Sequence, residues 1–322
     1  MFEDSFGRKI EYLRVSLTDR CNLRCRYCMP AEGIDKLRHE DILTLEEIER
    51  ITRILVAGGV RKVRFTGGEP LIRKGMTDLV RRISSLVEKP AVFMTTNGTL
   101  LEEYIDALAA AGLKGVNISL DTLSDQCFEE ITGKDLLPAV RRSIAKAAEK
   151  GLEVRLNTVL IKGINDNEAE LLALISKDID VSVRFIELMP IGCASALEGI
   201  GTDDLIRRFD ARFGKHIEVE DGAASSGPAR YVRYPGFKGK TGFISPLSHS
   251  FCRTCNRLRL TSDGKIKPCL CSPVYLDVRK LMREGADDDM IRDEIRKIIL
   301  GKPSGHDLTK TSVEDEMPRI GG

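Results

Sequence analysis

Short apolar runs rich in β-branched residues alternate with helical patterns along the first two thirds of the chain. The runs that predict strands are residues 13–17, 62–66, 91–95, 115–120, 153–160 and 182–187. A helical pattern follows each of them. The first, residues 44–56, has Thr44 three residues before Glu47, the spacing of a capping box, and Gly58-Gly59 ends it. Six successive strand–helix units predict a parallel barrel or sheet.

The unusual polar residues of the chain follow these runs. In a parallel fold, the residues just past the carboxyl ends of the strands form the active face. In chain order these are the cysteines of residues 21–28, Gly67-Gly68-Glu69-Pro70, Thr95 and Asn97, Ser119 and Asp121, Lys162, and Met189. We therefore expect one face of the molecule to gather all of them.

Three cysteines after the first run have the spacing Cys21-x3-Cys25-x2-Cys28. Three thiolates on one short loop can hold three corners of a 4Fe-4S cluster and leave the fourth iron open for chemistry. A structural zinc site would need a fourth ligand, and the nearest histidine, His39, lies outside the loop. A disulfide set would leave one thiol over, and the N-terminus carries no secretory apolar segment. The spacing therefore favours a cluster with one open iron.

From about residue 216 the alternating pattern breaks, and residues 221–240, rich in Gly, Ser and Pro, predict a linker or irregular loop. We place a domain boundary near residue 215. Beyond it stand Cys252-x2-Cys255-x13-Cys269 and, two residues later, Cys271. A second cluster with an open iron and a four-cysteine zinc site both fit these ligands, and spacing does not choose between them.

Two arginines between these cysteines, Arg257 and Arg259, lie on one side of any extended strand. Two guanidinium groups on one face suit a phosphate chain, while ordinary surface arginines are the alternative. A Walker loop is not the phosphate site. The nearest candidate is Gly239-Lys240-Thr241, and the motif needs a glycine five residues before Gly239, where this chain has Tyr234.

Composition limits the class of protein. Hydrophobic residues make up 42% of the 322 residues, which suffices for a large core, and no apolar run approaches the roughly 20 residues needed to span a membrane. Fifty basic against forty-nine acidic residues give a net charge of +1, so a dominant nucleic-acid surface is not expected. We expect a soluble cytoplasmic enzyme with no membrane and no nucleic-acid partner.

The cysteine triad with Tyr27 before its last member, followed by Gly67-Gly68-Glu69-Pro70, resembles the radical S-adenosylmethionine (SAM) superfamily. Within it the chain is similar, nearly end to end, to the GTP 3',8-cyclases of molybdenum cofactor biosynthesis. The segments that carry this resemblance are residues 13–25, 63–70, 95–98, 161–163, 184–189 and 255–259.

The resemblance implies a partial (β/α)6 TIM-like barrel over residues 1–215 and a C-terminal α+β extension, residues 216–322, that carries a second 4Fe-4S cluster. The first cluster would cleave SAM reductively, and the 5'-deoxyadenosyl radical would take hydrogen from the ribose C3' of GTP. Closure onto C8 would give (8S)-3',8-cyclo-7,8-dihydroguanosine 5'-triphosphate, the substrate of cyclic pyranopterin monophosphate synthase. An electron donor and a homodimer are also expected.

The resemblance also assigns residues by their places in these motifs. Cys21, Cys25 and Cys28 would hold the first cluster, and Cys252, Cys255 and Cys269 the second, whose open iron would bind the guanine. SAM would contact Tyr27, Gly68, Glu69, Ser119 and Met189. GTP would face Arg14, Arg64, Thr95, Lys162, Arg257, Leu258 and Arg259. Catalytic roles fall to Arg184 and to Gly321 and Gly322, in a tail expected to enter the active site.

Three cysteines remain outside this assignment. Cys271 is either a spare buried thiol or a replacement for Cys269, and Cys127 and Cys193 are expected to be small core residues.

Two other functions are compatible with the residues. One is a radical SAM enzyme that modifies a peptide or RNA, although such enzymes with auxiliary clusters usually carry more C-terminal cysteines. The other is a zinc-stabilised binding module, which predicts a colourless protein in place of a brown one that bleaches in air.

Overall fold

The computed structural model describes residues 1–220, 227–306 and 317. Its strands are β1 (Tyr12–Ser16), β2 (Lys62–Thr66), β3 (Ala91–Thr96), β4 (Leu113–Ser119), β5 (Glu153–Val159), β6 (Ser182–Ile186), β7 (Ile217–Val219), β8 (Arg230–Arg233), β9 (Lys240–Ile244), β10 (Arg257–Leu260), β11 (Lys265–Lys267) and β12 (Leu276–Asp277). Its α-helices are α1 (Leu45–Ala57), α2 (Met76–Ser84), α3 (Leu101–Ala110), α4 (Asp125–Thr132), α5 (Leu137–Glu149), α6 (Ala169–Asp178), α7 (Thr202–Phe213), α8 (Val278–Arg283) and α9 (Asp288–Leu300). Short 3-10 helices span Pro70–Ile72 (η2), Gly192–Ala196 (η4) and Cys252–Thr254 (η5), among others.

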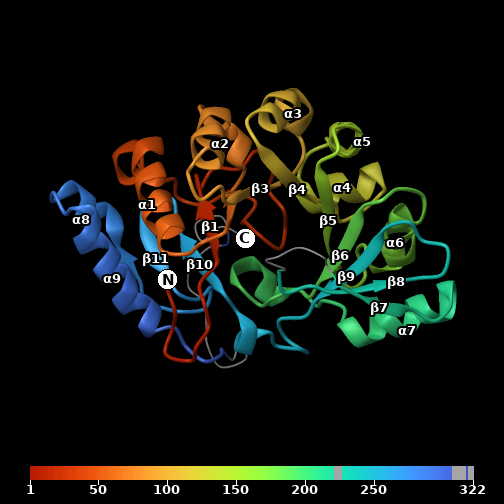
Figure 1. Cartoon of the computed structure of the whole chain (residues 1–322). Helices are drawn as coiled ribbons and strands as arrows, with labels where there is room; N and C mark the ends of the chain where they lie inside the picture. Colours follow the sequence, from red (N-terminus) through yellow and green to blue (C-terminus); the bar gives the residue numbers. More distant parts are fainter. Residues whose placement is uncertain (221–226, 307–316, 318–322) are drawn as a thin grey trace.

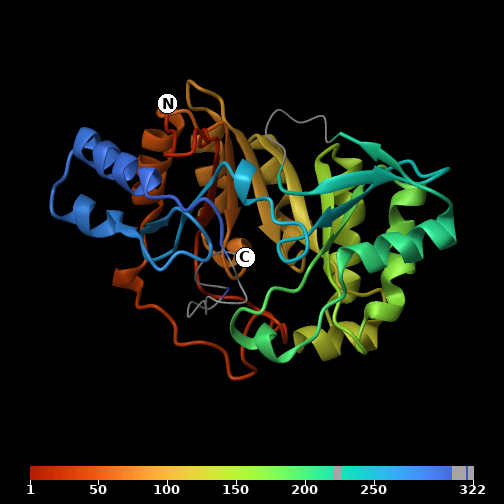
Figure 2. The same ribbon diagram turned by 90° about the horizontal axis from the view of Figure 1, so that it is seen from below.

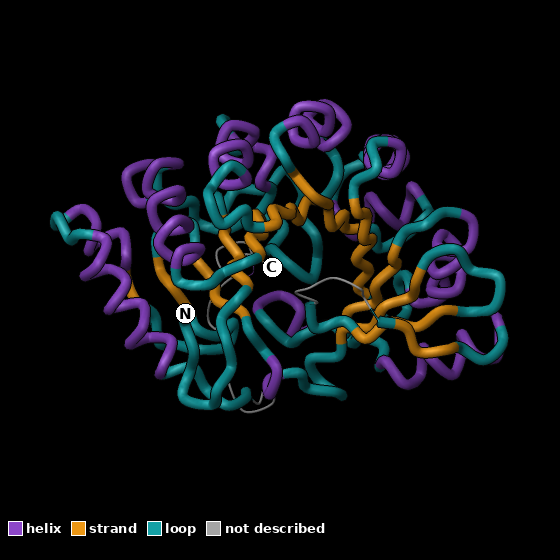
Figure 3. The backbone as a smooth tube through the Cα atoms, in the orientation of Figure 1, coloured by secondary structure: helices purple, strands orange, loops and turns teal. Residues whose placement is uncertain are grey.

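The described strands join one curved, open sheet, with helices α1 to α6 outside the arc of β1 to β6 (Figure 1). Colouring by secondary structure shows the strands inside and the helices around them (Figure 3). Strands β1 to β6 run in sequence order and are all parallel. The fold therefore confirms the partial (β/α)6 barrel.

The C-terminal region extends this sheet at both edges. Strand β10 pairs in parallel with β1, and β9 pairs in parallel with β6, so that eight parallel strands stand side by side. Antiparallel strands β11 and β12 continue one edge, and β8 and β7 continue the other. Seen from below, α8 and α9 lie at one end of the arc and α7 at the other (Figure 2).

One part of the expected irregular segment is a strand. Residues 230–233 form β8, whose Tyr231 and Val232 are buried and pair with Gly242 and Thr241 of β9. This pairing outweighs the Gly- and Pro-rich composition around it. The chain passes residue 215 between α7 and β7, and the strands before and after that point share the sheet, so the predicted domain boundary stays a prediction.

The strands place alternate residues on opposite faces. Leu13, Val63 and Leu258 point toward the helices and have no exposed surface, whereas Arg14 and Arg64 point into the hollow of the arc. The core thus lies between sheet and helices, and the concave face is left for polar chemistry.

The first helix begins and ends as its sequence predicts. The Thr44 side chain accepts a hydrogen bond from the Glu47 amide at 3.1 Å, and the Glu47 carboxylate accepts one from the Thr44 amide at 2.8 Å. Gly58 caps the helix, and Gly59 has a φ of +117°, which favours glycine.

Candidate active site

A cavity with two lobes lies inside the arc. The cysteine lobe is lined by Cys21, Cys25, Tyr27, Cys28, Gly67, Gly68, Thr95, Ser119, Asp121 and neighbours. The cationic lobe is lined by Arg14, Lys62, Arg64, Arg155, Arg184, Arg257, Arg259 and neighbours, including Cys252, Cys255 and Cys269. Asn157, Ile186, Met189 and Met317 line both lobes, so the two are continuous.

The three predicted cluster cysteines lie together in the cysteine lobe, on the loop that follows β1. Burial raises the pKa of the Cys21 and Cys25 thiols, so they are uncharged in the metal-free chain. The Leu23 amide and the Asn97 side chain donate to Cys21 Sγ at 3.4 and 3.8 Å, the arrangement that suits a thiolate bound to metal. No histidine and no fourth cysteine is among the described residues that line this lobe. The donors therefore fit a cluster with one open iron.

Gly67 and Gly68 let the cysteine loop pack against the end of β2. A Cβ on Gly68 would lie 2.3 Å from the Arg20 carbonyl oxygen, and one on Gly67, where φ is +155°, would lie 2.7 Å from the Thr18 oxygen. The close approach that needs glycine here is therefore that of the protein's own loop.

Glu69 has no exposed surface and is not among the described residues that line either lobe. Its carboxylate accepts hydrogen bonds from the Leu71 amide, the Thr96 hydroxyl and the Asn97 amide at 2.8–3.1 Å. Burial raises the pKa of Glu69 to about 7. The residue thus ties the second strand end to the third, and a direct contact with SAM stays a prediction.

The other predicted SAM residues, Tyr27, Gly68, Ser119 and Met189, all line the cysteine lobe. The Tyr27 hydroxyl donates to Asp121 Oδ2 at 2.7 Å, and burial raises the pKa of Asp121 to about 6. Thr95, predicted to face GTP, lines this lobe instead of the cationic one, and its buried hydroxyl has no hydrogen-bond partner among the described residues. This orphan hydroxyl is available to a ligand in the lobe, such as SAM.

The cationic lobe brings like charges together. Register places Arg259 beside Arg14 and Arg14 beside Arg64, on three neighbouring strands. Like charges directly opposite each other destabilise a sheet unless an anion is present. The described lining includes nine arginine and lysine side chains and no aspartate or glutamate.

The charges in the lobe shift one another's pKa values. Burial lowers the pKa of Arg14 to about 9, that of Arg259 to about 10 and that of Lys62 to about 8. Burial alone would raise the pKa of Tyr12, but the positive charges, Arg64 foremost, outweigh it and lower the pKa to about 7. The Tyr12 hydroxyl lies 2.6 Å from Arg64 Nε.

Arg184 is buried on β6 and donates from Nε to Asn157 Oδ1 at 2.9 Å. Asn157 lines both lobes, so Arg184 lies where they meet. Its catalytic role stays a prediction.

Two predicted GTP residues lie elsewhere. Lys162 is exposed, pairs with Glu198 at 2.7 Å and is not among the described lining of either lobe. Leu258 alternates with the two arginines of β10, and its side chain is fully buried in the core. Arg155 and Lys62 are in the lobe instead, and the sequence signal for them was their alternation with core residues along β5 and β2.

Cys252, Cys255 and Cys269 line the cationic lobe, together with His306, which the sequence did not single out. His306 Nδ1 lies 3.2 Å from Cys252 Sγ, and this contact lowers the pKa of Cys252 to about 7 and raises that of His306 to about 10. Cys271 donates to Cys269, which lowers the pKa of Cys269 and raises that of Cys271. Cys252, Cys255 and Cys269 therefore offer three ligands that face a cavity, a set that fits a second cluster.

Two expectations about the remaining residues differ in outcome. Gly321 and Gly322 lie outside the described residues, but Met317, from the same tail, lines both lobes. The expectation that Cys127 and Cys193 are core residues is wrong, since both are partly exposed. Cys127, on α4, lies with its Sγ 3.7 Å from the Ile164 carbonyl oxygen.

Comparison with known proteins agrees with this geometry. The family model of the radical SAM superfamily matches residues 15–175, and that named Molybdenum Cofactor Synthesis C matches residues 181–308. A Peptoclostridium acidaminophilum protein named GTP 3',8-cyclase is 47% identical over 325 residues, covering 99% of this chain and 98% of the relative. The chain belongs to the GTP 3',8-cyclase family. A second member, from Thermodesulfovibrio yellowstonii, is 46% identical over 94% of this chain and 95% of its own length.

Solved structures of other radical SAM proteins share the fold of this cyclase-family chain. Streptococcus suis SuiB, crystallised with its precursor peptide SuiA, has a TM-score of 0.64 at 16% identity and covers 97% of this chain and 76% of its own. The protein anSMEcpe with bound AdoMet has a TM-score of 0.55, also at 16% identity, over 90% of this chain and 84% of its own. Among the described residues, no helix has both the length and the apolar character needed to cross a membrane.

Proposed function

We propose that this chain is a radical SAM lyase that converts GTP to (8S)-3',8-cyclo-7,8-dihydroguanosine 5'-triphosphate in molybdenum cofactor biosynthesis. The observation that carries the proposal is the cationic lobe, which holds nine basic side chains without an acidic one in its described lining and opens into the cysteine lobe. A buried excess of positive charge needs a polyanion, and a nucleoside triphosphate is one.

The cysteine lobe would hold the first cluster on Cys21, Cys25 and Cys28 and SAM against Tyr27, Gly68, Ser119 and Met189. When bound, these groups supply a 5'-deoxyadenosyl radical that removes hydrogen from C3' of the ribose. The partly buried Tyr27–Asp121 hydrogen bond and the packing of Gly68 hold the lobe in shape for this ligand pair. Glu69 joins the ends of the same strands through its hydrogen bonds to Thr96 and Asn97, and its contact with SAM remains part of the proposal.

The cationic lobe would hold the triphosphate on Arg14, Arg64, Arg257 and Arg259, with Lys62 and Arg155 in support. Guanidinium groups bind phosphate oxygens with two parallel hydrogen bonds, and arginine-based binding suits an enzyme that keeps its triphosphate intact. Arg184, oriented by Asn157 where the lobes meet, would lie near the ribose and assist closure of C3' onto C8. Contacts of Thr95, Lys162 and the Leu258 backbone with GTP remain part of the proposal.

The second 4Fe-4S cluster is proposed on Cys252, Cys255 and Cys269, with its open iron facing the guanine, and Gly321 and Gly322 are proposed to act at the same site. The enzyme would further need an electron donor, pass its product to cyclic pyranopterin monophosphate synthase and form a homodimer. Its nine free cysteines suit the reducing cytoplasm.

The test is anaerobic reconstitution with iron and sulfide, followed by SAM, reductant and GTP deuterated at C3'. We expect a nucleotide product that has lost the C3' deuterium, because C3' is then bonded to C8, while the reductant supplies one electron and the solvent one proton to N7; the 5'-deoxyadenosine should have gained one deuterium. GTP deuterated at C2' is the matched control and transfers none. Formation of 5'-deoxyadenosine with intact GTP would refute the substrate, and colourless protein that holds zinc and consumes neither would favour a binding module.

A further inference from the structure

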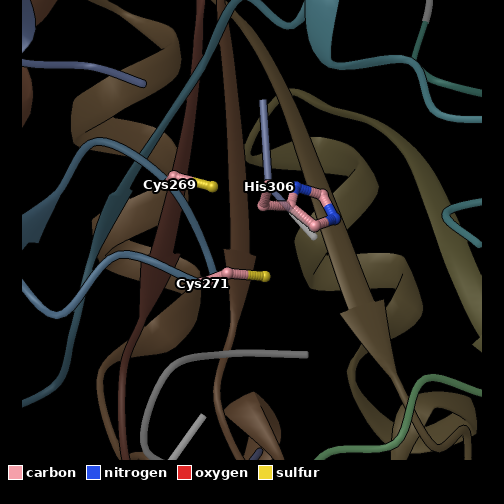
Figure 4. Close-up of side chains that lie close together, drawn as sticks. All are labelled: Cys269, Cys271 and His306. Atoms are coloured by element: carbon pink, nitrogen blue, oxygen red, sulfur yellow. The ribbon is translucent and has the colours of Figure 1, made fainter. Parts of the chain in front are cut away.

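Cys269, Cys271 and His306 form a compact group of metal ligands at the edge of the cationic lobe. Their ligand atoms all lie within 4.8 Å of one another. The two cysteines come from the loop after β11, and His306 comes from the segment after α9. Figure 4 shows both sulfur atoms pointing to the side on which the His306 ring lies.

The spacing of these atoms suits one metal ion. Two thiolates bound to the same Zn²⁺ at about 2.3 Å are at most about 4.6 Å apart, and a tetrahedral arrangement brings them closer. Thiolates that bind different irons of a 4Fe-4S cluster have an edge of the cluster between them, so they stand farther apart. Cys269 and Cys271 therefore match a shared ion better than two corners of one cluster.

The surroundings hold the group in place. Arg8 Nη1 donates to the Cys252 carbonyl at 2.7 Å, and Arg8 Nη2 donates to the Pro303 carbonyl at 2.7 Å. The same side chain thus joins the η5 loop to the segment that carries His306. Cys252 Sγ lies 3.2 Å from His306 Nδ1, so a fourth ligand is close by.

We propose that Cys269, Cys271 and His306 form a mononuclear Zn²⁺ site that is an alternative to the second cluster. Two thiolates and an imidazole are ligands that Zn²⁺ prefers, and Cys252 or water completes the tetrahedron. Cys269 belongs to both ligand sets, so the chain holds either the ion or the complete cluster. The site goes beyond the proposed GTP chemistry, because it needs two residues, Cys271 and His306, that the cluster does not use.

Cobalt tests the site, because tetrahedral Co²⁺ bound to thiolates has intense visible bands. The probe is CoCl₂, titrated anaerobically into metal-free full-length chain in which Cys21, Cys25 and Cys28 are serine. We expect one tetrahedral Co²⁺ per chain, displaced by Zn²⁺. Cys271→Ser and His306→Ala should each weaken Co²⁺ binding at least tenfold, while the matched control Cys193→Ser leaves it unchanged. Equal Co²⁺ affinity and spectra in this triple-serine chain with and without Cys271→Ser or His306→Ala would overturn the proposal.

The amount of iron that the chain takes up distinguishes the zinc site from the second cluster, and it does so without measuring GTP turnover. Chain with all native cysteines, preloaded with Zn²⁺, should take up one cluster's worth less iron than untreated chain. Cys271→Ser should take up the full amount with or without zinc. If Cys271→Ser alone lowers the iron content, Cys271 is a cluster ligand and the proposal fails. His306→Ala, which keeps every thiol, supplies an independent answer if the serine variant does not fold.

Discussion

At the scale of single residues, Glu69 shows how a residue that the sequence assigns to ligand binding can act through the protein. Glu69 was predicted to contact SAM, and its carboxylate is fully buried and accepts three hydrogen bonds from its own chain. No local pattern distinguishes these two roles, because the Thr96 and Asn97 donors lie on another strand. The fold alone brings them within reach.

Replacing Glu69 by glutamine should destabilise the protein. The two oxygens accept from the Leu71 and Asn97 amides, so an amide group in their place must turn a donor toward one of these N–H groups. A buried donor left without an acceptor costs about 1–3 kcal/mol, and we expect that loss in the free energy of unfolding by urea. Glu103→Gln, on the exposed side of α3, should change it by less than about 0.5 kcal/mol. Equal stability of both variants would show that the hydrogen bonds of Glu69 do not stabilise the connection between the ends of β2 and β3.

At the scale of elements, the alternation along β10, β1 and β2 sets the function of the cavity. Leu258 enters the core, and the flanking arginines enter the lobe. Their neighbours across the sheet are Tyr12 and Arg14 of β1. The pairing of these strands therefore determines which side chains line the cationic lobe.

Arg259→Gln should weaken GTP binding. Loss of a charge-assisted hydrogen bond costs about 1.5–3 kcal/mol, which corresponds to a rise in Kd of about ten- to a hundredfold. The measurement is anaerobic equilibrium dialysis with labelled GTP. Arg253→Gln is the matched control, because Arg253 is exposed on the neighbouring η5 turn, and its Kd should be that of wild type. A wild-type Kd in Arg259→Gln would remove β10 from the GTP site.

Gly68→Ala should displace the cysteine loop. Its Cβ would lie 2.3 Å from a backbone oxygen of Arg20, which cannot swing away as a side chain could. Overpacking of this kind costs about 1–3 kcal/mol, and we expect lower unfolding free energy together with loss of iron from the first cluster. In the control Gly301→Ala the Cβ would have ordinary contacts no closer than 3.5 Å, so the unfolding free energy and the iron content should stay those of wild type. Normal iron content in Gly68→Ala would show that the loop tolerates the shift.

The six central strands were predictable because apolar runs recur with helices between them, and all six match within two residues at either end. Strands β9 and β10 were not predicted as parallel neighbours of β6 and β1, because their pairing joins segments far apart in sequence. Lys62 and Arg155 were missed because they lie within strands, where the sequence analysis named only residues assigned by the family resemblance. His306 was missed because it follows Cys269 only after two helices, with no local spacing to mark it.

At the scale of the whole molecule, charge is segregated. The chain as a whole has a net charge of +1, yet the described lining of the cationic lobe includes nine basic side chains and no acidic one. Composition could not reveal this, because surface acids balance the sum. The lobe therefore stores electrostatic repulsion that an anionic ligand relieves.

GTP should raise the Tm of the reconstituted enzyme, and the rise should be smaller at pH 9 than at pH 7.5. The pKa of Lys62 is about 8 in the ligand-free chain, so the side chain is mainly charged at the lower pH and mainly neutral at the higher one. A polyanion binds the protonated form better, so affinity falls as pH rises. Differential scanning calorimetry under nitrogen measures both values. Lys62→Arg keeps its charge and should reduce the difference; a larger rise at pH 9 in wild type would contradict the argument.

Arg8→Lys should weaken the contacts that join the N-terminal residues 4–8 to the Cys252 turn and to the segment before His306. The buried Arg8 guanidinium pairs with Asp4 at 2.5 Å and also reaches the Cys252 and Pro303 carbonyls, which a single ammonium cannot do at once. Disrupting a buried charge pair costs about 3–5 kcal/mol, an upper limit here because the charge is kept. The free energy of unfolding, measured with urea, and the iron content should both fall. The control Arg61→Lys, at an exposed site, should change neither.

The pairing of β10 with β1 also has a consequence during synthesis. The outer edge of β1 has no parallel neighbour on its β10 side until about 240 further residues have been made, which takes roughly 12–50 s at ordinary ribosome speeds. For that time a short, apolar edge is open to pairing with other nascent chains. Production of this protein should therefore depend on holding chaperones and on translation rate, and truncation before Arg257 should yield aggregates instead of a smaller barrel.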